Sequence, residues 1–383
     1  MPTHGPVPWA IAPHTAAKHQ IYATYLRDWF EILMRGQRAF RFATYAEGFA
    51  GPGVYSTGEL GSPVLAVKAL IESPKLAEFT REGKFVFVDD DHRCIGRLIA
   101  ELTDHVGLEV YTDPATRGTI LGNVRRARSD TPVRIVEGSC ADHLETALDA
   151  AGAWGQPIFA NLDSWGNAPV PYRLLKRIAE NKAGEVIVTL APQHFIRFVE
   201  TAGERLDEVF GHVPDWRQLA SQEPGNKRRF VLTKYREALA RAGFQFILDF
   251  ELKPVTGDSL YLVFGTNNRK GLATMKRALW DVDPTFGVGF RDPRDDQGEL
   301  LFNVSNAQDA PLQRFLAARL SAGPEWVPRL RDAAVLQTVY RETHVLPAVE
   351  KMVSAGRLQV VGGGPVRLGS RVELIRPLHS DGL

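Results

Sequence analysis

The stretch Tyr45-Ala-Glu-Gly-Phe-Ala-Gly-Pro-Gly53 decides how the rest of the 383-residue chain is interpreted. Residues 40–45 are rich in aromatic and β-branched side chains, which predicts a short buried strand. A Gly- and Ser-rich turn follows at 56–62, and 63–72 predicts a helix. A strand ending in an acid, a Gly-x-Gly loop and a helix are typical of a nucleotide site in a doubly wound α/β sheet. Because Gly-x-Gly also occurs in ordinary turns, matching strand ends are needed downstream.

The amino-acid composition limits the classes of protein to which the chain can belong. A hydrophobic content of 44% and a charged content of 24% are typical of a soluble globular protein, and the length suggests two domains. A net charge of +1 gives no global attraction to nucleic acid or to an anionic membrane. Only Cys94 and Cys140 occur, which excludes a disulfide framework and a zinc ribbon. We therefore expect a cytoplasmic protein with no metal site and no membrane span.

Acidic residues follow two further predicted strands. The strand 84–88 precedes Asp89-Asp90-Asp91, which places a carboxylate at the edge of the sheet where open α/β folds bind ligands. Asp89, the first residue after this strand, is the candidate for the ribose hydroxyls of a nucleoside, and Asp91 is the candidate N-cap of a helix at 93–104. A solvated acidic loop is the alternative. The strand 133–136 leads to Asp142, which fits recognition of an adenine amine.

The strand 157–162 ends in Asp163-Ser164-Trp165, before a predicted helix at 172–180. The carboxylate of Asp163 suits the orientation or deprotonation of a nucleophile, and the indole of Trp165 suits stacking on a planar group. A strand-to-helix turn with a packed Trp is the alternative. The strand 185–190 leads to His194, which is either an acid–base group or a structural histidine.

Periodicity and charge predict the structure of the flanking segments. A helix at 15–35 has Thr15 as its expected N-cap, with surface positions for Lys18 and His19 and a binding role as the alternative. The basic segment 114–130 predicts a solvated helix face, with contact to an anionic substrate as the alternative. Its basic residues are Arg117, Arg125, Arg126 and Arg128. Two strands, a helix and a linker are predicted next, at 244–252, 259–265, 270–279 and 283–296.

The C-terminal part changes character. Its predicted elements are helices at 311–320, 333–341 and 345–355, the last with Thr343 as N-cap, and strands at 358–361 and 371–375. Helices followed by a β-hairpin predict a winged-helix module. From residue 307 onward Lys and Arg exceed Asp and Glu by only three, so contact with protein and contact with nucleic acid both stay open. The expected division is an N-terminal segment and helix (1–35), a Rossmann-like α/β domain (36–300) and this module (301–383).

The motifs together resemble the three-Cys-motif partner proteins over about residues 15–360. These proteins are Rossmann-like, of the S-adenosylmethionine-binding class I methyltransferase type, and are associated with a radical-SAM-like protein. The matching motifs are Lys18-His19-x-Ile21, Tyr25-Leu26-x-x-Trp29, Glu47 to Gly53, Gly61-Ser-Pro63, Asp89, Asp163-x-x-Gly166, Leu260 to Phe264 and Met275-Lys-x-Ala278-Leu-Trp280. By resemblance, the cofactor S-adenosylmethionine contacts Glu47, Gly48, Phe49, Ala50, Gly51, Pro52, Gly53, Asp89 and Asp142. Glu47, Gly51 and Gly53 would hold its methionine end, Asp89 its ribose and Asp142 its adenine.

The resemblance implies a methyltransferase acting on a nucleic-acid base or another planar acceptor. Asp163, Ser164 and Trp165 are then the catalytic candidates, and a radical-SAM-like protein, DNA or RNA the candidate partners. The family usually has proline after the acid, where this chain has Ser164. That difference favours an alternative, a non-catalytic S-adenosylmethionine-binding scaffold in DNA repair or phage-related biology. An NAD-dependent oxidoreductase is a third alternative, but the spacing from Gly53 to Asp89 exceeds the usual interval of about 20 residues.

Overall fold

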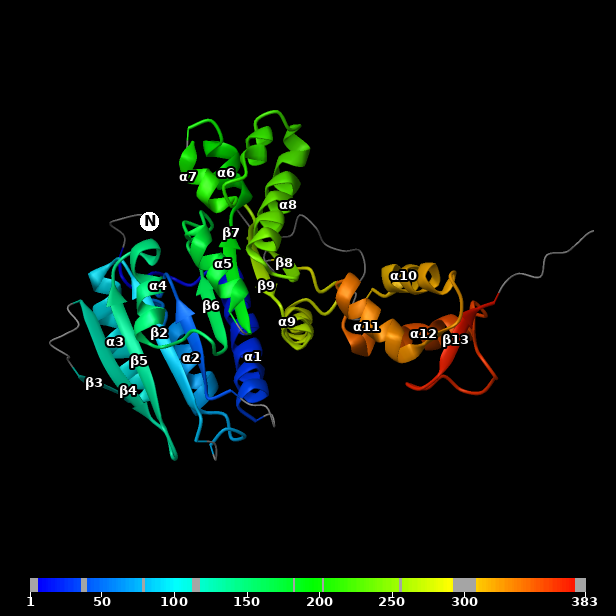
Figure 1. Cartoon of the computed structure of the whole chain (residues 1–383), viewed down its shortest axis with the longest axis horizontal. Coiled ribbons are helices and arrows are strands. Elements are labelled where there is room, and N and C mark those ends of the chain that lie inside the picture. Colours follow the sequence, from blue (N-terminus) through cyan, green and yellow to red (C-terminus); the bar gives the residue numbers. More distant parts are fainter. Residues whose placement is uncertain are drawn as a thin grey trace, which may run out of the picture. The chain divides into compact units, whose positions relative to one another are not determined.

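The computed structural model describes residues 6–35, 40–77, 80–111, 118–181, 183–201, 203–254, 257–291 and 308–375. These residues form two compact units. The first comprises the described residues up to 271 together with Gly289–Arg291, and the second comprises 272–288 and the described residues from 308 on (Figure 1). In the part of the chain that is described, no helix combines the length and the apolar character needed to cross a membrane.

The first unit is built on a ten-stranded sheet. Its strands are β1 (Phe42–Glu47), β2 (Glu82–Asp89), β3 (Leu108–Tyr111), β4 (Thr119–Arg125), β5 (Asp130–Glu137), β6 (Ile158–Leu162), β7 (Gly184–Leu190), β8 (Phe246–Lys253), β9 (Leu260–Thr266) and β10 (Gly289–Arg291). They lie in the order β10-β8-β9-β7-β6-β1-β2-β5-β4-β3. The strands β7, β6, β1, β2 and β5 are parallel, whereas β9 runs antiparallel to both β7 and β8. The central strands β5-β2-β1-β6-β7 form the parallel core of a Rossmann-like sheet, so the predicted α/β fold class of this unit is confirmed.

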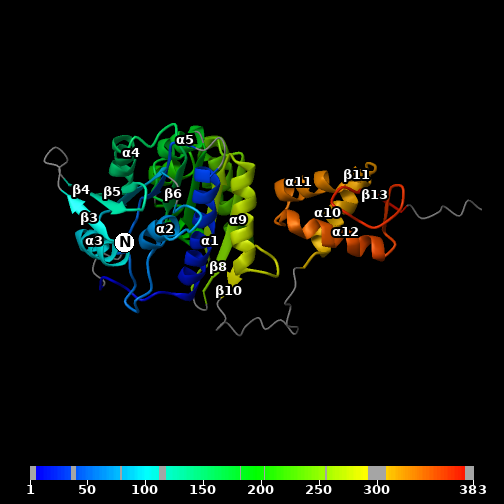
Figure 2. The same ribbon diagram turned by 90° about the horizontal axis from the view of Figure 1, so that it is seen from below.

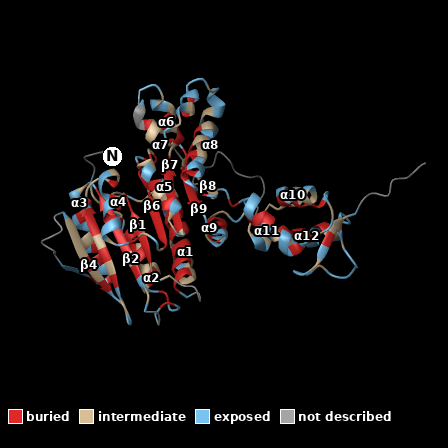
Figure 3. Cartoon of the chain, viewed as in Figure 1, coloured by how far each residue is buried: buried red, intermediate tan, exposed pale blue. Residues whose placement is uncertain are grey.

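Helices cover both faces of the sheet. They are α1 (Pro13–Arg35), α2 (Ser62–Ile71), α3 (His92–Val106), α4 (Cys140–Ala150), α5 (Tyr172–Glu180), α6 (Pro192–Phe198), α7 (Glu204–Val209), the 3-10 helix η1 (Pro214–Leu219) and α8 (Pro224–Ala242). Figure 2 shows α1, α2 and α3 on one face and α4 and α5 on the other. Sandwiched strands are apolar on both sides, as in β6 and β7, all of whose residues are buried. Figure 3 shows this buried layer.

The helix α1 is held to the sheet by an aromatic stripe. Its Tyr25 and Trp29 rings lie 5.2 and 6.0 Å from the ring of Phe159 on β6, between ring centroids. Tyr25 also donates a 2.6 Å hydrogen bond to the buried carboxylate of Glu185 on β7. The spacing of these residues along the helix places them on one face. Packing of this kind fixes the first turns of α1 beside the carboxyl ends of the strands.

Several local predictions are wrong. The helix α1 begins at Pro13, so Thr15 lies inside its first turn and is not the N-cap. The basic segment 114–130 forms no helix where it is described, because β4 and the start of β5 occupy it. Arg125 there pairs with Glu109 across the β3–β4 hairpin, with 3.0 Å between nitrogen and oxygen. Arg117 lies outside the described residues. In the predicted linker 283–296, residues 289–291 form β10, and residues from 292 on are not described.

The second unit has its own core. Its elements are α9 (Arg269–Val282), which begins three residues before the unit does, α10 (Ala310–Leu320), β11 (Glu325–Trp326), α11 (Val327–Gln337), the 3-10 helix η2 (Glu342–His344), α12 (Val345–Ser354), β12 (Leu358–Val360) and β13 (Arg371–Leu374). The strands form an antiparallel sheet in the order β11-β13-β12. Thr343 lies within η2, and His344 rather than Thr343 precedes α12, so the predicted cap is wrong. Trp280 of α9 packs in this core.

Candidate active site

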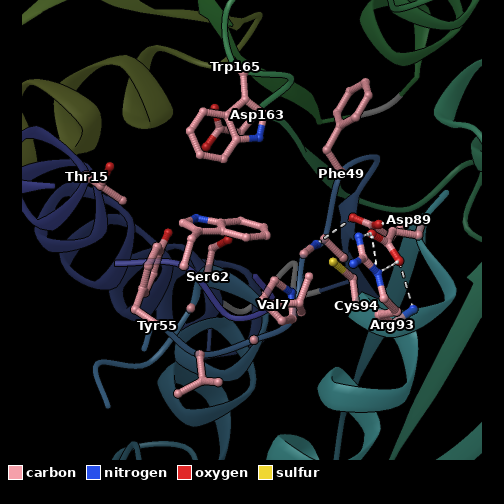
Figure 4. A pocket seen from close by; sticks show the side chains of 18 of the residues that line it. Val7, Thr15, Phe49, Tyr55, Ser62, Asp89, Arg93, Cys94, Asp163 and Trp165 are labelled. Atoms are coloured by element: carbon pink, nitrogen blue, oxygen red, sulfur yellow. Dashed lines mark hydrogen bonds and ion pairs between the residues drawn. The ribbon is translucent and has the colours of Figure 1, made fainter. Parts of the chain in front are cut away.

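A pocket of about 990 Å³ lies at the carboxyl ends of β1, β2 and β6. Three parts of the sheet edge line it: the loop after β1, the turn from Asp89 to Cys94, and the loop that carries Asp163 and Trp165. A fourth wall comes from the N-terminal segment between residue 6 and the first turns of α1. Figure 4 shows Asp89, Arg93 and Cys94 grouped together, with Asp163 and Trp165 elsewhere around the pocket. Three of the predicted strand ends, those of β1, β2 and β6, therefore meet at one site.

The glycine loop brings bare backbone to this pocket. Gly51 and Gly53 have φ angles of +66° and +74°, which favour glycine. Gly61, at the start of α2, donates a 2.7 Å hydrogen bond to the carbonyl of Gly53. A Cβ on Gly61 would lie 2.8 Å from the carbonyl carbon of Gly53. The two backbone segments can therefore touch only because Gly61 has no side chain.

Asp89 is the last residue of β2 and joins the two loops beside it. Its Oδ2 accepts a 2.7 Å hydrogen bond from the backbone nitrogen of Gly51, and its Oδ1 accepts a 3.0 Å bond from that of Asp91. Burial raises the pKa of this carboxyl, and the two backbone donors oppose that shift. Each carboxylate oxygen has a second lone pair, so Asp89 retains acceptor capacity on the pocket wall. Asp91 accepts from the backbone nitrogen of Arg93 and caps α3, as predicted.

Glu47 lies beneath the loop and outside the pocket wall formed by the described residues. It accepts a 2.7 Å hydrogen bond from the hydroxyl of Tyr45 and a 2.9 Å bond from that of Ser62. Burial raises the pKa of Glu47 to about 8, so the carboxyl is mostly protonated at neutral pH. Glu47 therefore positions Ser62, which lines the pocket. Direct contact of Glu47 with a cofactor stays a prediction.

Asp163 follows β6 and forms an ion pair with Lys18 of α1. Burial raises the pKa of this carboxyl, but the charge and the hydrogen bond of Lys18, together with smaller effects of other neighbours, outweigh it, and the net shift is downward. Both residues line the pocket. Lys18 and His19 were both predicted to lie on the surface, yet both are buried. Helical spacing could have indicated the burial of Lys18, because this residue lies on the same helix face as Tyr22, Tyr25 and Trp29.

Trp165 projects from this loop with unusual backbone geometry. Its φ is +60°, a conformation rare for a bulky residue, and 56% of its surface is exposed. The neighbouring Ser164 is instead buried, and its hydroxyl accepts a 2.8 Å hydrogen bond from the backbone nitrogen of Ala168. Ser164 lies off the pocket wall that the described residues form, so its contacts are those of a residue that shapes the loop.

Trp9 is a pocket residue that sequence reasoning missed. Its ring centroid lies 5.5 Å from that of Trp165 and 6.4 Å from that of Tyr55. The carbonyl of Trp9 accepts a 2.8 Å hydrogen bond from the backbone nitrogen of Ser56, in the turn before α2. Its indole lies 3.7 Å from the place that a Cβ on Gly51 would take. No periodic pattern marks this Pro-rich segment, and its partners are distant in sequence.

The remaining candidates divide into two groups. Phe49, Ala50 and Pro52 line the pocket, whereas Gly48 lies behind it, where a Cβ would be 2.4 Å from the sulfur of Cys140. Asp142 is exposed in the first turn of α4 and accepts a 2.6 Å hydrogen bond from Ser139. Asp142 and His194 both lie apart from the pocket wall seen in the described residues. A role for Asp142 at the adenine therefore stays a prediction.

No protein-family model matches the sequence, and no curated protein matches it. Among solved structures, Trm1 from Pyrococcus horikoshii with S-adenosyl-L-methionine is 12% identical, with 70% of this chain and 59% of that chain covered and a TM-score of 0.39. The O-methyltransferase from Bacillus cereus in complex with SAH is 10% identical over 70% of this chain and 84% of that chain, with a TM-score of 0.32. The O-methyltransferase TomG from Streptomyces achromogenes in complex with SAM is 10% identical over 68% and 93%, with a TM-score of 0.31. TM-scores this low assign no function, and the chain spans 59% of the length of Trm1.

Proposed function

We propose that the first unit is an S-adenosylmethionine-dependent methyltransferase. The observation that carries the proposal is the hydrogen bond that joins Gly51 to Asp89, in the same pocket as Asp163 and Trp165. A glycine loop after the first strand and an acid at the end of the second are the parts that hold a nucleoside in open α/β sheets. An acid and an aromatic residue at a third strand end supply the means to hold an acceptor.

The residues fit this cofactor. Asp89 has lone pairs left for the ribose hydroxyls, and the bare backbone of Gly51 and Gly53 leaves room for the methionine end. Ser62 adds a hydroxyl that Glu47 orients. When bound, S-adenosylmethionine supplies an electrophilic methyl group on a positively charged sulfur. The task of the chain is then to position the acceptor, which is worth several kcal/mol when the reacting atoms are aligned.

The acceptor in this proposal is planar. Trp165 and Trp9 offer exposed or half-buried indole faces at the pocket, and Asp163 lies in the same wall. Rings that stack on aromatic side chains gain about 1–3 kcal/mol each in nucleic-acid complexes. A flipped or single-stranded nucleobase is one such acceptor, and a small aromatic molecule is another.

Ultraviolet crosslinking of methyl-labelled S-adenosylmethionine tests the site. We expect label in peptides that contain residues 45–53 or 89–94, and loss of that label when S-adenosylhomocysteine competes. Label that appears only elsewhere in the chain, or that resists competition, would count against the proposal. Glu180, which is exposed at the end of α5 and is not among the residues that line the pocket, offers a control peptide.

For the second unit, we propose a winged-helix module that contacts nucleic acid or a partner protein. The order α10, β11, α11, α12, β12, β13 and the sheet order β11-β13-β12 support it. On the exposed side of α12, Lys351 pairs with Asp309 across 2.7 Å. The exposed Arg367 and Arg371 instead border the β12–β13 hairpin. Binding of double- and single-stranded DNA and of RNA should weaken with salt and with Arg367→Ala; a salt-independent interaction favours a protein partner, including a radical-SAM-like protein.

A non-catalytic cofactor-binding scaffold is the second candidate. It is favoured by one observation, because Lys18 already occupies the carboxylate of Asp163. In this case Asp163→Asn would leave cofactor binding and partner binding intact and would change no product. A change in methyl transfer in Asp163→Asn, in either direction and with cofactor affinity kept, supports the enzyme instead.

A further inference from the structure

The ion pair between Lys18 and Asp163 sets the charge at the acceptor end of the pocket. Lys18 donates to Oδ2 of Asp163, and the two side chains are 10% and 20% exposed. Both residues line the pocket together with Trp9 and Trp165. The ammonium group of lysine has three donors, so the bond to Asp163 leaves it able to bind another acceptor atom.

Four titratable groups near this pair have pKa values shifted toward their uncharged forms. Burial lowers the pKa of His19 to about 3, and burial raises the pKa of Glu47 to about 8. Burial also raises the pKa of Tyr22 and of Tyr55. Among these six groups the opposite charges are those of the Lys18–Asp163 ion pair.

This arrangement disfavours an amine acceptor. An amine can still use the remaining lone pairs of Asp163, but it gains no charge-assisted bond from the ammonium group of Lys18, whose own charge already neutralises that carboxylate. An acceptor that reacts through an anionic oxygen is instead favoured by the ammonium group of Lys18. A phenolate, enolate or carboxylate oxygen would bind Lys18 through a charge-assisted hydrogen bond, the stronger kind.

A purely structural ion pair is the competing explanation. Buried pairs add little net stability, because desolvation offsets the attraction between the charges. The aromatic stripe of Tyr25 and Trp29 already fixes α1 on the sheet. A pair that faces the pocket is thus better explained by what it does to a ligand.

We propose that the acceptor is an aromatic or otherwise planar molecule that reacts through an anionic oxygen, with Lys18 as the residue that binds this oxygen. The inference rests on the proposed methyltransferase function. The acceptor proton leaves to water before transfer, as Lys18 favours the anion. The O–C bond to the methyl group then forms while the S–C bond of the sulfonium breaks, and sulfur keeps the electron pair. The negative charge on oxygen and the positive charge on sulfur cancel in the products.

The binding of 4-nitrophenol tests this inference without turnover, because only its anion absorbs strongly in the visible range. The probe is added to the complex of the protein with S-adenosylhomocysteine at a pH where free 4-nitrophenol is mostly protonated. We expect the bound probe to ionise. Lys18→Met should weaken binding of the anion about 10- to 100-fold, and Lys18→Arg should restore part of it. Asp163→Asn should strengthen binding of the anion, because it leaves Lys18 without its partner.

Two controls separate charge from structure. Lys75→Met removes the ion pair between Lys75 and Glu31. Glu31 lies on α1, as Lys18 does, so this variant removes a different ion pair of the same helix and should leave the absorption spectrum of the bound probe unchanged. The second control is 4-nitroaniline, which has the same shape with an amine and should bind more weakly than 4-nitrophenol.

Four results would overturn the inference: preference for the amine, an ionisation that Lys18→Met leaves intact, the same loss in Lys75→Met, or no binding of the phenol by a protein that binds S-adenosylhomocysteine. Failure of the wild type to bind S-adenosylhomocysteine at all would instead refute the proposed function.

Discussion

Gly51 donates its backbone N–H to Oδ2 of Asp89 across 2.7 Å, which ties the loop after β1 to the last residue of β2. The bond fixes the bare backbone of the loop beside a carboxylate that still has free lone pairs. A second acid, Asp163, stands at the end of β6, next to β1 in the sheet. In the proposed function, the half of the pocket at Gly51 and Asp89 holds the nucleoside, and the half at Asp163 holds a planar acceptor.

Replacing glycine by alanine should lower stability where Gly61 contacts Gly53 and should raise stability at an open position within a helix. Gly61→Ala would place a Cβ 2.8 Å from the backbone of Gly53, so we expect a loss of about 1–3 kcal/mol in the free energy of unfolding. Gly96→Ala in α3 meets no atom within 4 Å and should gain about 0.5–1 kcal/mol. Urea unfolding measures both. Equal effects would show that the two backbone segments are not in close contact.

The raised pKa of Glu47 makes the stability of the fold depend on pH. Its pKa is raised from 4.5 to about 8 in the folded state by burial, so the folded protein holds a proton that the unfolded chain has lost. Stability from this group is complete below pH 4.5 and is lost as the pH rises to about 8, by at most about 5 kcal/mol. Glu47→Gln removes the titration. The free energy of unfolding of the wild type should fall relative to Glu47→Gln between these pH values, and parallel curves would refute the assignment.

Trp165 can be replaced by glycine with little change in the free energy of unfolding, although the substitution alters the pocket. Trp165→Gly relieves about 1–2 kcal/mol of left-handed strain and loses about 0.5–1.5 kcal/mol of contact with Trp9. We therefore expect the free energy of unfolding to stay within about 1 kcal/mol of the wild type. Trp216→Ala, at a buried Trp in η1, should lose about 3–5 kcal/mol in the same assay. A large loss in Trp165→Gly would show that this indole is structural.

Lys276 is a buried cation in the second unit. Its ammonium group donates to the carbonyls of Val335 and Thr338 at the C-terminal end of α11, where helix dipoles favour positive charge. Lys276→Met leaves both carbonyls without this donor and should destabilise the unit by about 1–3 kcal/mol. Amide hydrogen exchange should rise in α11 and α12. Exchange that stays at the wild-type rate in these helices would contradict the role assigned to Lys276.

The parts of the fold that local signals determine could be predicted from the sequence. The helix α5 begins at Tyr172 and ends at Glu180, as predicted, because turn residues and Pro171 mark its start. Asp91 caps α3, as its position after a strand indicated. The glycine loop and the acids at the ends of β2 and β6 were found because parallel strands bring their carboxyl ends together.

The parts that depend on distant partners could not be predicted in this way. The segment around Arg125 was predicted to be a helix, but pairing of β4 with β3 and β5 decides its structure. Lys18 was assigned to the surface, since its partner Asp163 lies 145 residues away. Trp9 carries no periodic signal, and its place in the pocket depends on Ser56 and Trp165.

Calorimetric titration of S-adenosylmethionine and S-adenosylhomocysteine tests the central claim most directly. The proteins are the wild type, Asp89→Asn, and Asp149→Asn as a control, since Asp149 pairs with Arg177 on an exposed surface. We predict binding by the wild type and by Asp149→Asn, and affinity about 10- to 100-fold weaker in Asp89→Asn, which loses the charge that assists its hydrogen bonds. A folded wild type that binds neither ligand, or Asp89→Asn binding as tightly as the wild type, would contradict the account.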